Sequence, residues 1–285
     1  MTDGSATLDR FGISTATLAG SLSEKLHAAR AAGFTSVSLA ARDVVAHPDG
    51  VDAAAAMIRR SGLRVGAFQS LRDFEGLPPH LRDYKLEVTK SLLDLMERVD
   101  ARLLLVGSST SPNASGDIRR IADDLSLLGT LATPRGIRIA YEPLAWARFV
   151  NDCETAWRAV KLADRENVGL GVDAFHVLAR STPPAWFDAV PGDRIFLVQL
   201  ADYLWDLDDL VETSGHHRVF PSEGNHGAII AELVAKLASI GYAGDFMLDV
   251  TNDDYLHLPA AAVAGRARNA ARWTIDSLHP SGRSA

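Results

Sequence analysis

Four side chains that carry oxygen lie at the ends of four separate apolar segments, where a strand would leave a sheet. They are Glu142 after RIAY, Asp173 after VGLGV, Gln199 within IFLVQLAD and Asp249 after DFML. If these segments are neighbouring parallel strands, their carboxyl ends meet and the four oxygens converge. Carboxylates held that close repel one another unless a cation lies between them. The pattern therefore predicts a divalent metal centre. Oxygen ligands favour Mg²⁺ or Mn²⁺, with Zn²⁺ and Co²⁺ as alternatives.

Groups suited to proton transfer lie beside these candidate ligands. His176 comes three residues after Asp173, and a histidine there can act as a general acid or base near neutral pH. Glu142 is the second candidate for proton transfer. The alternative for His176 is a structural histidine at the start of a helix, with its ring bonded to the backbone.

Two segments carry residues that could hold an anionic substrate. Arg218 in SGHHRVFPSEGN is the natural clamp for a carboxylate, because a guanidinium can donate two parallel hydrogen bonds to it. Ser214 in the same segment can add a donor. Arg72 in SLRDFEG is the second candidate, and its alternative is a surface ion pair with Asp73 or Glu75.

Strand-like and helix-like segments alternate along the chain and supply the elements that must position these residues. The expected strands cover 11–18, 36–40, 63–71, 101–108, 137–142, 168–173, 194–202 and 245–250. The expected helices cover 23–33 (N-cap Ser23), 52–61, 80–99, 115–133, 152–165 (N-cap Asp152), 226–240 and 259–278, with 203–224 irregular. Eight such units predict one (β/α)8 TIM-barrel domain over residues 1–285. The alternative is an open doubly wound sheet, although the first strand lacks a glycine-rich phosphate loop.

Composition limits the class of protein. The chain has 285 residues, 47% of them apolar, and no Pro/Gly/Ser-rich linker divides it. The formal charge of −7, with both signs mixed, argues against a nucleic-acid partner. The single Cys153 excludes an internal disulfide and suits a reducing cytosol. Without a signal peptide or a membrane-spanning apolar segment, we expect a cytoplasmic protein with no membrane partner. The sequence leaves the oligomeric state open, including a homo-oligomer.

The residues from about 138 to 256 resemble the xylose-isomerase-like barrels (sugar phosphate isomerases and epimerases), and specifically the bacterial 3-dehydroshikimate dehydratases. The resemblance is carried by YEPLAWARFVND, GVDAFHVLA, PGDRIFLVQLAD, HHRVFPSEGN and TNDDY, with FQSLRDFEG upstream. The Gln in FLVQLAD is the most specific point, since the wider superfamily usually has His there. The resemblance implies that Glu142, Asp173, Gln199 and the strand-8 acid hold a divalent metal. It also implies that His176 is the catalytic histidine and that Arg72, Ser214 and Arg218 hold the substrate.

Two positions depart from that family pattern. Where the dehydratases have Glu on strand 8, this chain has Asp249, which is one methylene shorter. Where the family has FPGQGD, this chain has FPSEGN, and Glu223 is either an extra acid or a solvated one. Nearby, His216 and His217 are adjacent and should point apart, so we do not expect them to chelate one ion together.

Three hypotheses for function follow. The first is a metal-dependent lyase that dehydrates 3-dehydroshikimate, or a similar cyclic polyhydroxy keto acid, through a metal-stabilised enolate. In it, His176 takes a proton beside the ketone and returns it to the departing hydroxyl. The second is a sugar or inosose isomerase or epimerase, in which Glu142 and Asp249 share the proton transfer. The third is a barrel that binds a small ligand without catalysis.

Overall fold

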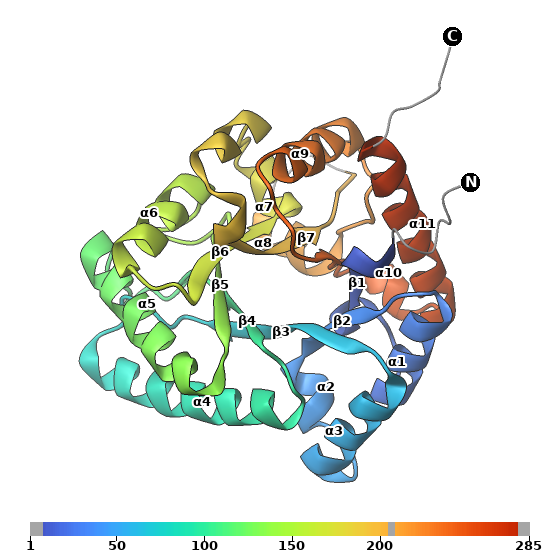
Figure 1. The fold of residues 1–285 in the computed structure, drawn as a ribbon, viewed down its shortest axis with the longest axis horizontal. Coiled ribbons are helices and arrows are strands. Elements are labelled where there is room, and N and C mark those ends of the chain that lie inside the picture. The colour runs from blue at the N-terminus through green and yellow to red at the C-terminus, as the bar shows by residue number, and fades with distance from the viewer. Residues whose placement is uncertain (1–7, 205–208, 279–285) are drawn as a thin grey trace.

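Eight parallel strands close into a barrel. The computed structural model describes residues 8–204 and 209–278. Each strand pairs with the next along the chain, and the last pairs with the first (Figure 1). The strands are β1 (Phe11–Ser14), β2 (Ser36–Ala40), β3 (Arg64–Arg72), β4 (Leu103–Gly107), β5 (Arg138–Glu142), β6 (Val168–Asp173), β7 (Ile195–Leu200) and β8 (Phe246–Leu248). The predicted (β/α)8 fold is confirmed, and the open sheet is excluded because this sheet closes on itself.

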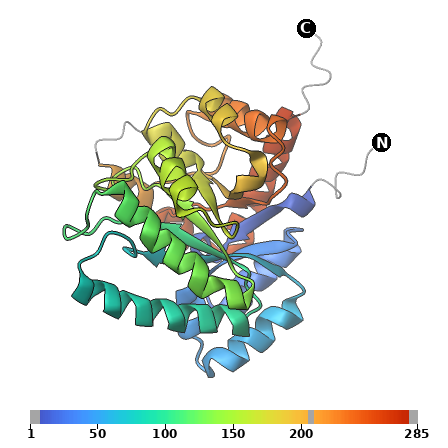
Figure 2. The same ribbon diagram turned by 60° about the vertical axis from the view of Figure 1, so that its left-hand side comes forward.

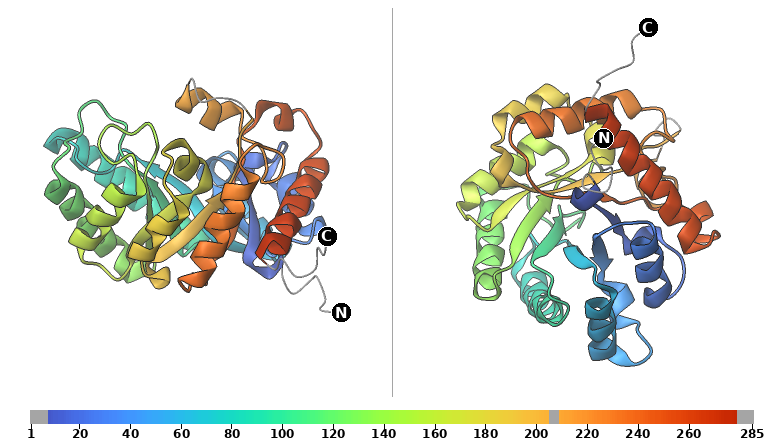
Figure 3. Two further views of the ribbon diagram at one scale, coloured as in Figure 1. Left: turned by 90° about the horizontal axis from the view of Figure 1, so that it is seen from above. Right: turned by 45° about the vertical axis from the view of Figure 1, so that its right-hand side comes forward.

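Helices surround the ring of strands (Figures 1 and 2). They are α1 (Leu22–Ala31), α2 (Ala41–Val45), α3 (Gly50–Ser61), α4 (Pro79–Arg98), α5 (Ile118–Ala132), α6 (Cys153–Ala163), α7 (Ala174–Ala179), α8 (Leu210–His216), α9 (Gly227–Ser239), α10 (Asp253–Leu256) and α11 (Ala260–Leu278). Short 3-10 turns are η1 (Leu8–Arg10), η2 (Thr15–Thr17), η3 (Thr133–Arg135), η4 (Pro184–Ala189) and η5 (Gly192–Arg194). The last helix, α11, packs against the first, α1, so the first and last units of the barrel are neighbours (Figure 3). Among the described helices, none is long and apolar enough to cross a membrane.

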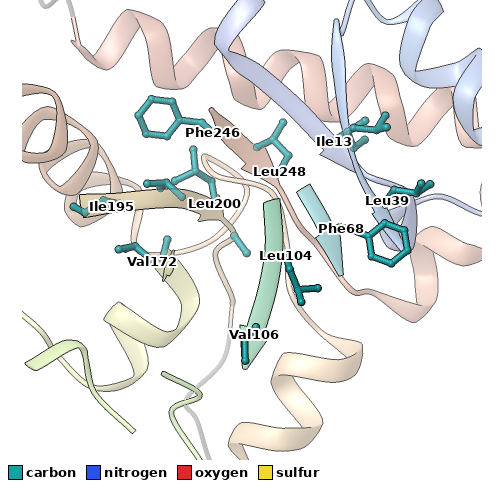
Figure 4. Packing of buried hydrophobic residues seen from close by; sticks show 14 of the residues in the cluster. Ile13, Leu39, Phe68, Leu104, Val106, Val172, Ile195, Leu200, Phe246 and Leu248 are labelled. Carbon is teal, nitrogen blue, oxygen red and sulfur yellow. The ribbon is translucent and has the colours of Figure 1, made fainter. Parts of the chain in front are cut away.

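Alternation along each strand decides which side chains face the helices and which face the barrel axis. Leu200 and Leu248 face outward and belong to the large apolar layer between strands and helices (Figure 4). Gln199 and Asp249 are their immediate neighbours in sequence, and so they point inward. A second apolar cluster fills the space below them and consists of Ala67, Leu103, Leu105, Ala140, Phe196, Leu197 and Met247. Polar residues therefore occupy only the carboxyl-terminal end of the interior on these strands.

Most boundaries differ from the sequence predictions by one or more residues, and three of the differences have a clear physical cause. Strand β1 ends at Ser14 rather than at residue 18, because the Ser14 hydroxyl accepts a hydrogen bond from the Ala16 amide and starts a 3-10 turn. Helix α1 is capped by Ser21, not Ser23, through a reciprocal capping box with Glu24. The segment expected to be irregular contains α8, whose N-cap Asp209 accepts hydrogen bonds from two backbone amides. The cap predicted at Asp152 is confirmed.

Candidate metal centre and active site

The four predicted oxygen ligands all lie at the carboxyl-terminal end of the barrel. Asp173 and Gln199 are direct partners in the β6–β7 register, and the Asp249 amide donates to the Leu200 carbonyl at the end of β7. A cavity of about 430 Å³ opens above them, and its lining includes Glu142, Asp173 and Asp249. Gln199 is 1% exposed and lies just beneath. The fold therefore gathers the predicted residues in one place.

A tight group forms around Glu142, Asp173 and His176. One potential ligand atom from each lies within 4.8 Å of the other two, and all three side chains are buried. Two oxygens here are buried without a hydrogen-bond partner among the described residues, namely Glu142 Oε1 and Gln199 Oε1. Burial, and then the charge of Asp173, raise the pKa of Glu142 well above its ordinary value. A divalent cation would satisfy both unpartnered oxygens and relieve this repulsion, so the residues present fit a metal ion.

Asp249 stands apart from that group. Its Oδ2 accepts a hydrogen bond from Gln199 Nε2 at 2.6 Å, and its Oδ1 accepts one from Gln69 Nε2 at 3.3 Å. Gln69 also donates to Ser14 Oγ at 2.9 Å and to Ser38 Oγ at 2.8 Å. Gln69 was not predicted as a functional residue, although a glutamine inside the apolar β3 segment VGAFQSL indicates an inward-facing polar group.

His176 is held in one orientation. Its Nδ1 accepts a hydrogen bond from the backbone amide of Ala145 at 3.2 Å, and its Nε2 lies 3.7 Å from Asp173 Oδ2. The Trp146 ring packs against it edge-on, with 5.0 Å between ring centroids. Burial, followed by the charges of Arg218 and Arg72, lowers the pKa of His176 well below its ordinary value. The ring is therefore neutral near pH 7, and because Nδ1 is an acceptor, Nε2 carries the hydrogen.

Arg218 and Ser214 meet beneath the cavity. Arg218 Nη1 donates to Asp173 Oδ2 at 2.6 Å, while Nη2 donates to Ser214 Oγ at 2.6 Å. Arg218 Nε donates to the Ser214 carbonyl at 3.0 Å, and the Phe175 ring covers the guanidinium. Both residues line the cavity, and their role in binding substrate stays a prediction. Arg218 also neutralises a predicted metal ligand, a contact that the sequence did not indicate.

Two arginines line the cavity without an ion pair among the described residues. One is the predicted Arg72, and the other is Arg42 on α2, which the sequence analysis did not single out. The alternative partners of Arg72 are engaged elsewhere: Asp73 accepts from the Thr110 amide at 2.7 Å, and Glu75 accepts from the Ser109 amide at 2.6 Å. The cavity thus presents two guanidinium groups toward whatever occupies it.

The polar residues of α8 and of the loop that follows it pair with partners in different parts of the structure. His216 lines the cavity, and its Nδ1 lies 3.0 Å from Asp253. Glu223 was expected to be an extra acid or a solvated one, but its two oxygens accept hydrogen bonds from Arg266 at 2.9 and 2.8 Å. Tyr255 donates a further bond to Glu223 at 2.7 Å. The charge of Glu223 is therefore neutralised against α11.

Comparison with protein families and curated proteins gives a consistent result. A family model described as "Xylose isomerase-like TIM barrel" matches residues 26–276. A 3-dehydroshikimate dehydratase of Pseudomonas aeruginosa is 38% identical over 252 residues, which is 88% of this chain but 39% of that protein. An inosose isomerase of Bacillus subtilis is 28% identical over 163 residues, 54% of this chain and 53% of that protein. The chain therefore spans about two-fifths of the length of the curated dehydratase that it matches.

Solved structures agree with the fold. A xylose isomerase-like TIM barrel/4-hydroxyphenylpyruvate dioxygenase fusion protein superposes with a TM-score of 0.91 at 33% identity, covering 95% of this chain and 44% of that one. The IOLI protein, crystallised with a bound zinc atom, has a TM-score of 0.82 at 19% identity, covering 96% of this chain and 100% of that one. At that lower identity the likeness concerns the barrel alone.

Proposed function

The chain belongs to the xylose isomerase-like TIM-barrel family, and on that premise we propose that it is a divalent-metal-dependent dehydratase. Its substrate would be 3-dehydroshikimate or a similar cyclic polyhydroxy keto acid. The single observation that carries the metal is the pair of buried, unpartnered oxygens Glu142 Oε1 and Gln199 Oε1 beside Asp173. The similarity to the curated dehydratase supports the chemistry.

Glu142, Asp173 and Gln199 would hold the cation, and Asp249 accepts a hydrogen bond from the Gln199 amide. All three donors are oxygens, so Mg²⁺ or Mn²⁺ is the first choice. A bound divalent cation would polarise the substrate ketone and stabilise the negative charge that develops on its oxygen.

The hydrogen bond from Ala145 to His176 Nδ1 assigns the proton steps. Neutral His176 carries its hydrogen on Nε2 and can pass it to the departing hydroxyl, which leaves as water, while the proton that Glu142 takes from the carbon returns to His176 and restores the neutral ring. The sequence suggested that His176 also takes the first proton, but that needs a bare Nε2. We assign removal of the proton beside the ketone to Glu142, whose side chain lines the cavity. Loss of water leaves an aromatic catechol acid, and aromaticity drives the reaction forward.

The charge of the cavity favours an anionic substrate. Its lining includes three carboxylates, on Glu142, Asp173 and Asp249, and three guanidinium groups, on Arg42, Arg72 and Arg218. These balance, so a divalent cation would leave the cavity with an excess of two positive charges. A substrate carboxylate relieves that excess, whereas a neutral sugar does not. This balance favours the keto acid over the neutral substrate of an isomerase or epimerase.

The test is incubation with 3-dehydroshikimate and Mg²⁺ or Mn²⁺, followed by the ultraviolet absorbance of the catechol product. We expect product from the wild type, much less from Glu142→Gln, and much less from His176→Gln, which keeps the size of the side chain but not its acid function. If the wild type forms no catechol product but interconverts inosose isomers, the isomerase hypothesis replaces the dehydratase hypothesis. Binding of substrate without any turnover would indicate a non-catalytic barrel.

A further inference from the structure

The contacts of Asp249 set it apart from the other predicted metal ligands. We propose that Asp249 is not a metal ligand but a positioning residue that acts through Gln199. Its carboxylate holds the Gln199 amide so that Oε1 faces Glu142 and Asp173. The proposal rests on the proposed metal centre, but it does not depend on which substrate is used.

The two ends of the Gln199 side-chain amide have different surroundings. Gln199 Nε2 donates to Asp249 Oδ2 at 2.6 Å, while Gln199 Oε1 is buried and has no partner among the described residues. An amide rotated by half a turn would set Oε1 against the Asp249 carboxylate and lose this hydrogen bond. Asp249 therefore decides which end of Gln199 is offered to the carboxylate group. A metal ion needs the oxygen end.

The Asp249 carboxylate is itself held in place by residues of other strands. Gln69 on β3 donates to Asp249 Oδ1 and is fixed in turn by Ser14 on β1 and Ser38 on β2. These contacts draw the carboxylate toward the β1–β3 side of the barrel. Among the described residues, the candidate ligand atoms that lie within 4.8 Å of one another belong to Glu142, Asp173 and His176, and Asp249 is not part of this group.

The side chain of Asp249 is also short for a metal ligand at this position. Aspartate is shorter than glutamate by one methylene, about 1.5 Å along the side chain. A glutamate in this place could reach past the Gln199 amide to the cation. Asp249 is instead at hydrogen-bonding distance from that amide, which is the arrangement of groups that orient a metal ligand from behind.

A double-mutant cycle on Mn²⁺ affinity tests this assignment. The dissociation constant is measured by isothermal titration calorimetry for the wild type, Asp249→Ala, Gln199→Ala and the double variant, each with its melting temperature recorded without metal. Asp249→Ala should weaken Mn²⁺ binding about 10–100-fold in the wild type. In the Gln199→Ala background it should add little. Asp249→Asn, which keeps an oxygen to accept the Gln199 bond, should bind Mn²⁺ within a few-fold of the wild type.

The matched control is Asp253→Ala, because Asp253 is an exposed acid that pairs with His216 at the cavity rim. It should leave Mn²⁺ affinity unchanged. The proposal is overturned if Asp249→Ala costs the same factor in both backgrounds, or if Asp249→Asn loses as much affinity as Asp249→Ala. A protein that follows the predicted cycle but forms no catechol product would refute the dehydratase and leave this inference standing.

Discussion

Replacement by glutamine should change the free energy of unfolding in opposite directions at the buried Glu142 and the partly exposed Glu223. Glu142 is 5% exposed, its Oε1 has no partner, and burial and Asp173 raise its pKa well above the ordinary value. Replacing it by glutamine removes a charge that Arg218 and Arg72 compensate only in part, because burial and Asp173 outweigh them. A buried polar group without partners costs about 1–3 kcal/mol and a charged one costs more, so we expect the neutral amide to be less costly by an amount of this order. Glu142→Gln should therefore raise the free energy of unfolding of the metal-free protein by about that amount.

Glu223 provides the contrast. Its two oxygens accept bonds from Arg266 and Tyr255, and the ion pair is partly exposed, with side-chain exposures of 27% for Glu223 and 39% for Arg266. Glu223→Gln weakens charge-assisted bonds, and with allowance for solvent screening we expect a loss of about 1 kcal/mol. For a chain of this size each kcal/mol shifts the melting temperature by about 2–4 °C.

The assay is thermal and urea unfolding of chelator-treated protein, repeated with saturating Mn²⁺. Without metal, Glu142→Gln should melt above the wild type and Glu223→Gln below it. With Mn²⁺ the wild type and Glu223→Gln should gain stability, because a ligand that binds only the folded state stabilises it, whereas Glu142→Gln should gain little. The reasoning is refuted if Glu142→Gln destabilises the metal-free protein, or if Mn²⁺ stabilises it as much as the wild type.

Three further predictions concern the cavity rim and two titrating groups. Arg72→Gln should raise KM for the keto acid about 10–100-fold, the value of one hydrogen bond to a charged group, while Arg60→Gln on the exposed face of α3 should leave it unchanged. Burial raises the pKa of Glu75, so its contribution to stability is lost as pH rises from the ordinary value of 4.5 through the folded value. Glu75→Gln should remove that part of the pH dependence in urea unfolding, and an unchanged slope would contradict it. Asp253 raises the pKa of His216, and Asp253→Asn should lower the NMR titration midpoint of His216 toward 6.5.

The sequence predicted the barrel because local and global signals agree along most of the chain. Apolar segments ended at Glu142, Asp173 and Gln199, and alternation in the strands turned all three toward the axis. Their proximity followed from topology alone. The β1 boundary was missed because the Ser14 side chain, bonded to its own backbone two residues on, ends the strand early.

Contacts between side chains from distant strands could not be read from spacing. That Gln69 on β3 and Gln199 on β7 both bond Asp249 depends on rotamers at the barrel mouth. Glu223 was expected near the substrate or in solvent, and only the packing of the loop on α11 brings it to Arg266. Arg42 was overlooked because nothing in its local sequence separates it from a solvated arginine.

We propose that this barrel dehydrates an anionic keto acid only when a divalent cation is bound beneath its cavity. Metal-stripped protein is titrated with Mn²⁺ while the catechol product of 3-dehydroshikimate is followed by ultraviolet absorbance. We predict no product from stripped protein, and a rate that rises with bound Mn²⁺ and saturates at one equivalent per chain. Product formation by the stripped protein, or full Mn²⁺ occupancy without product, would contradict the account.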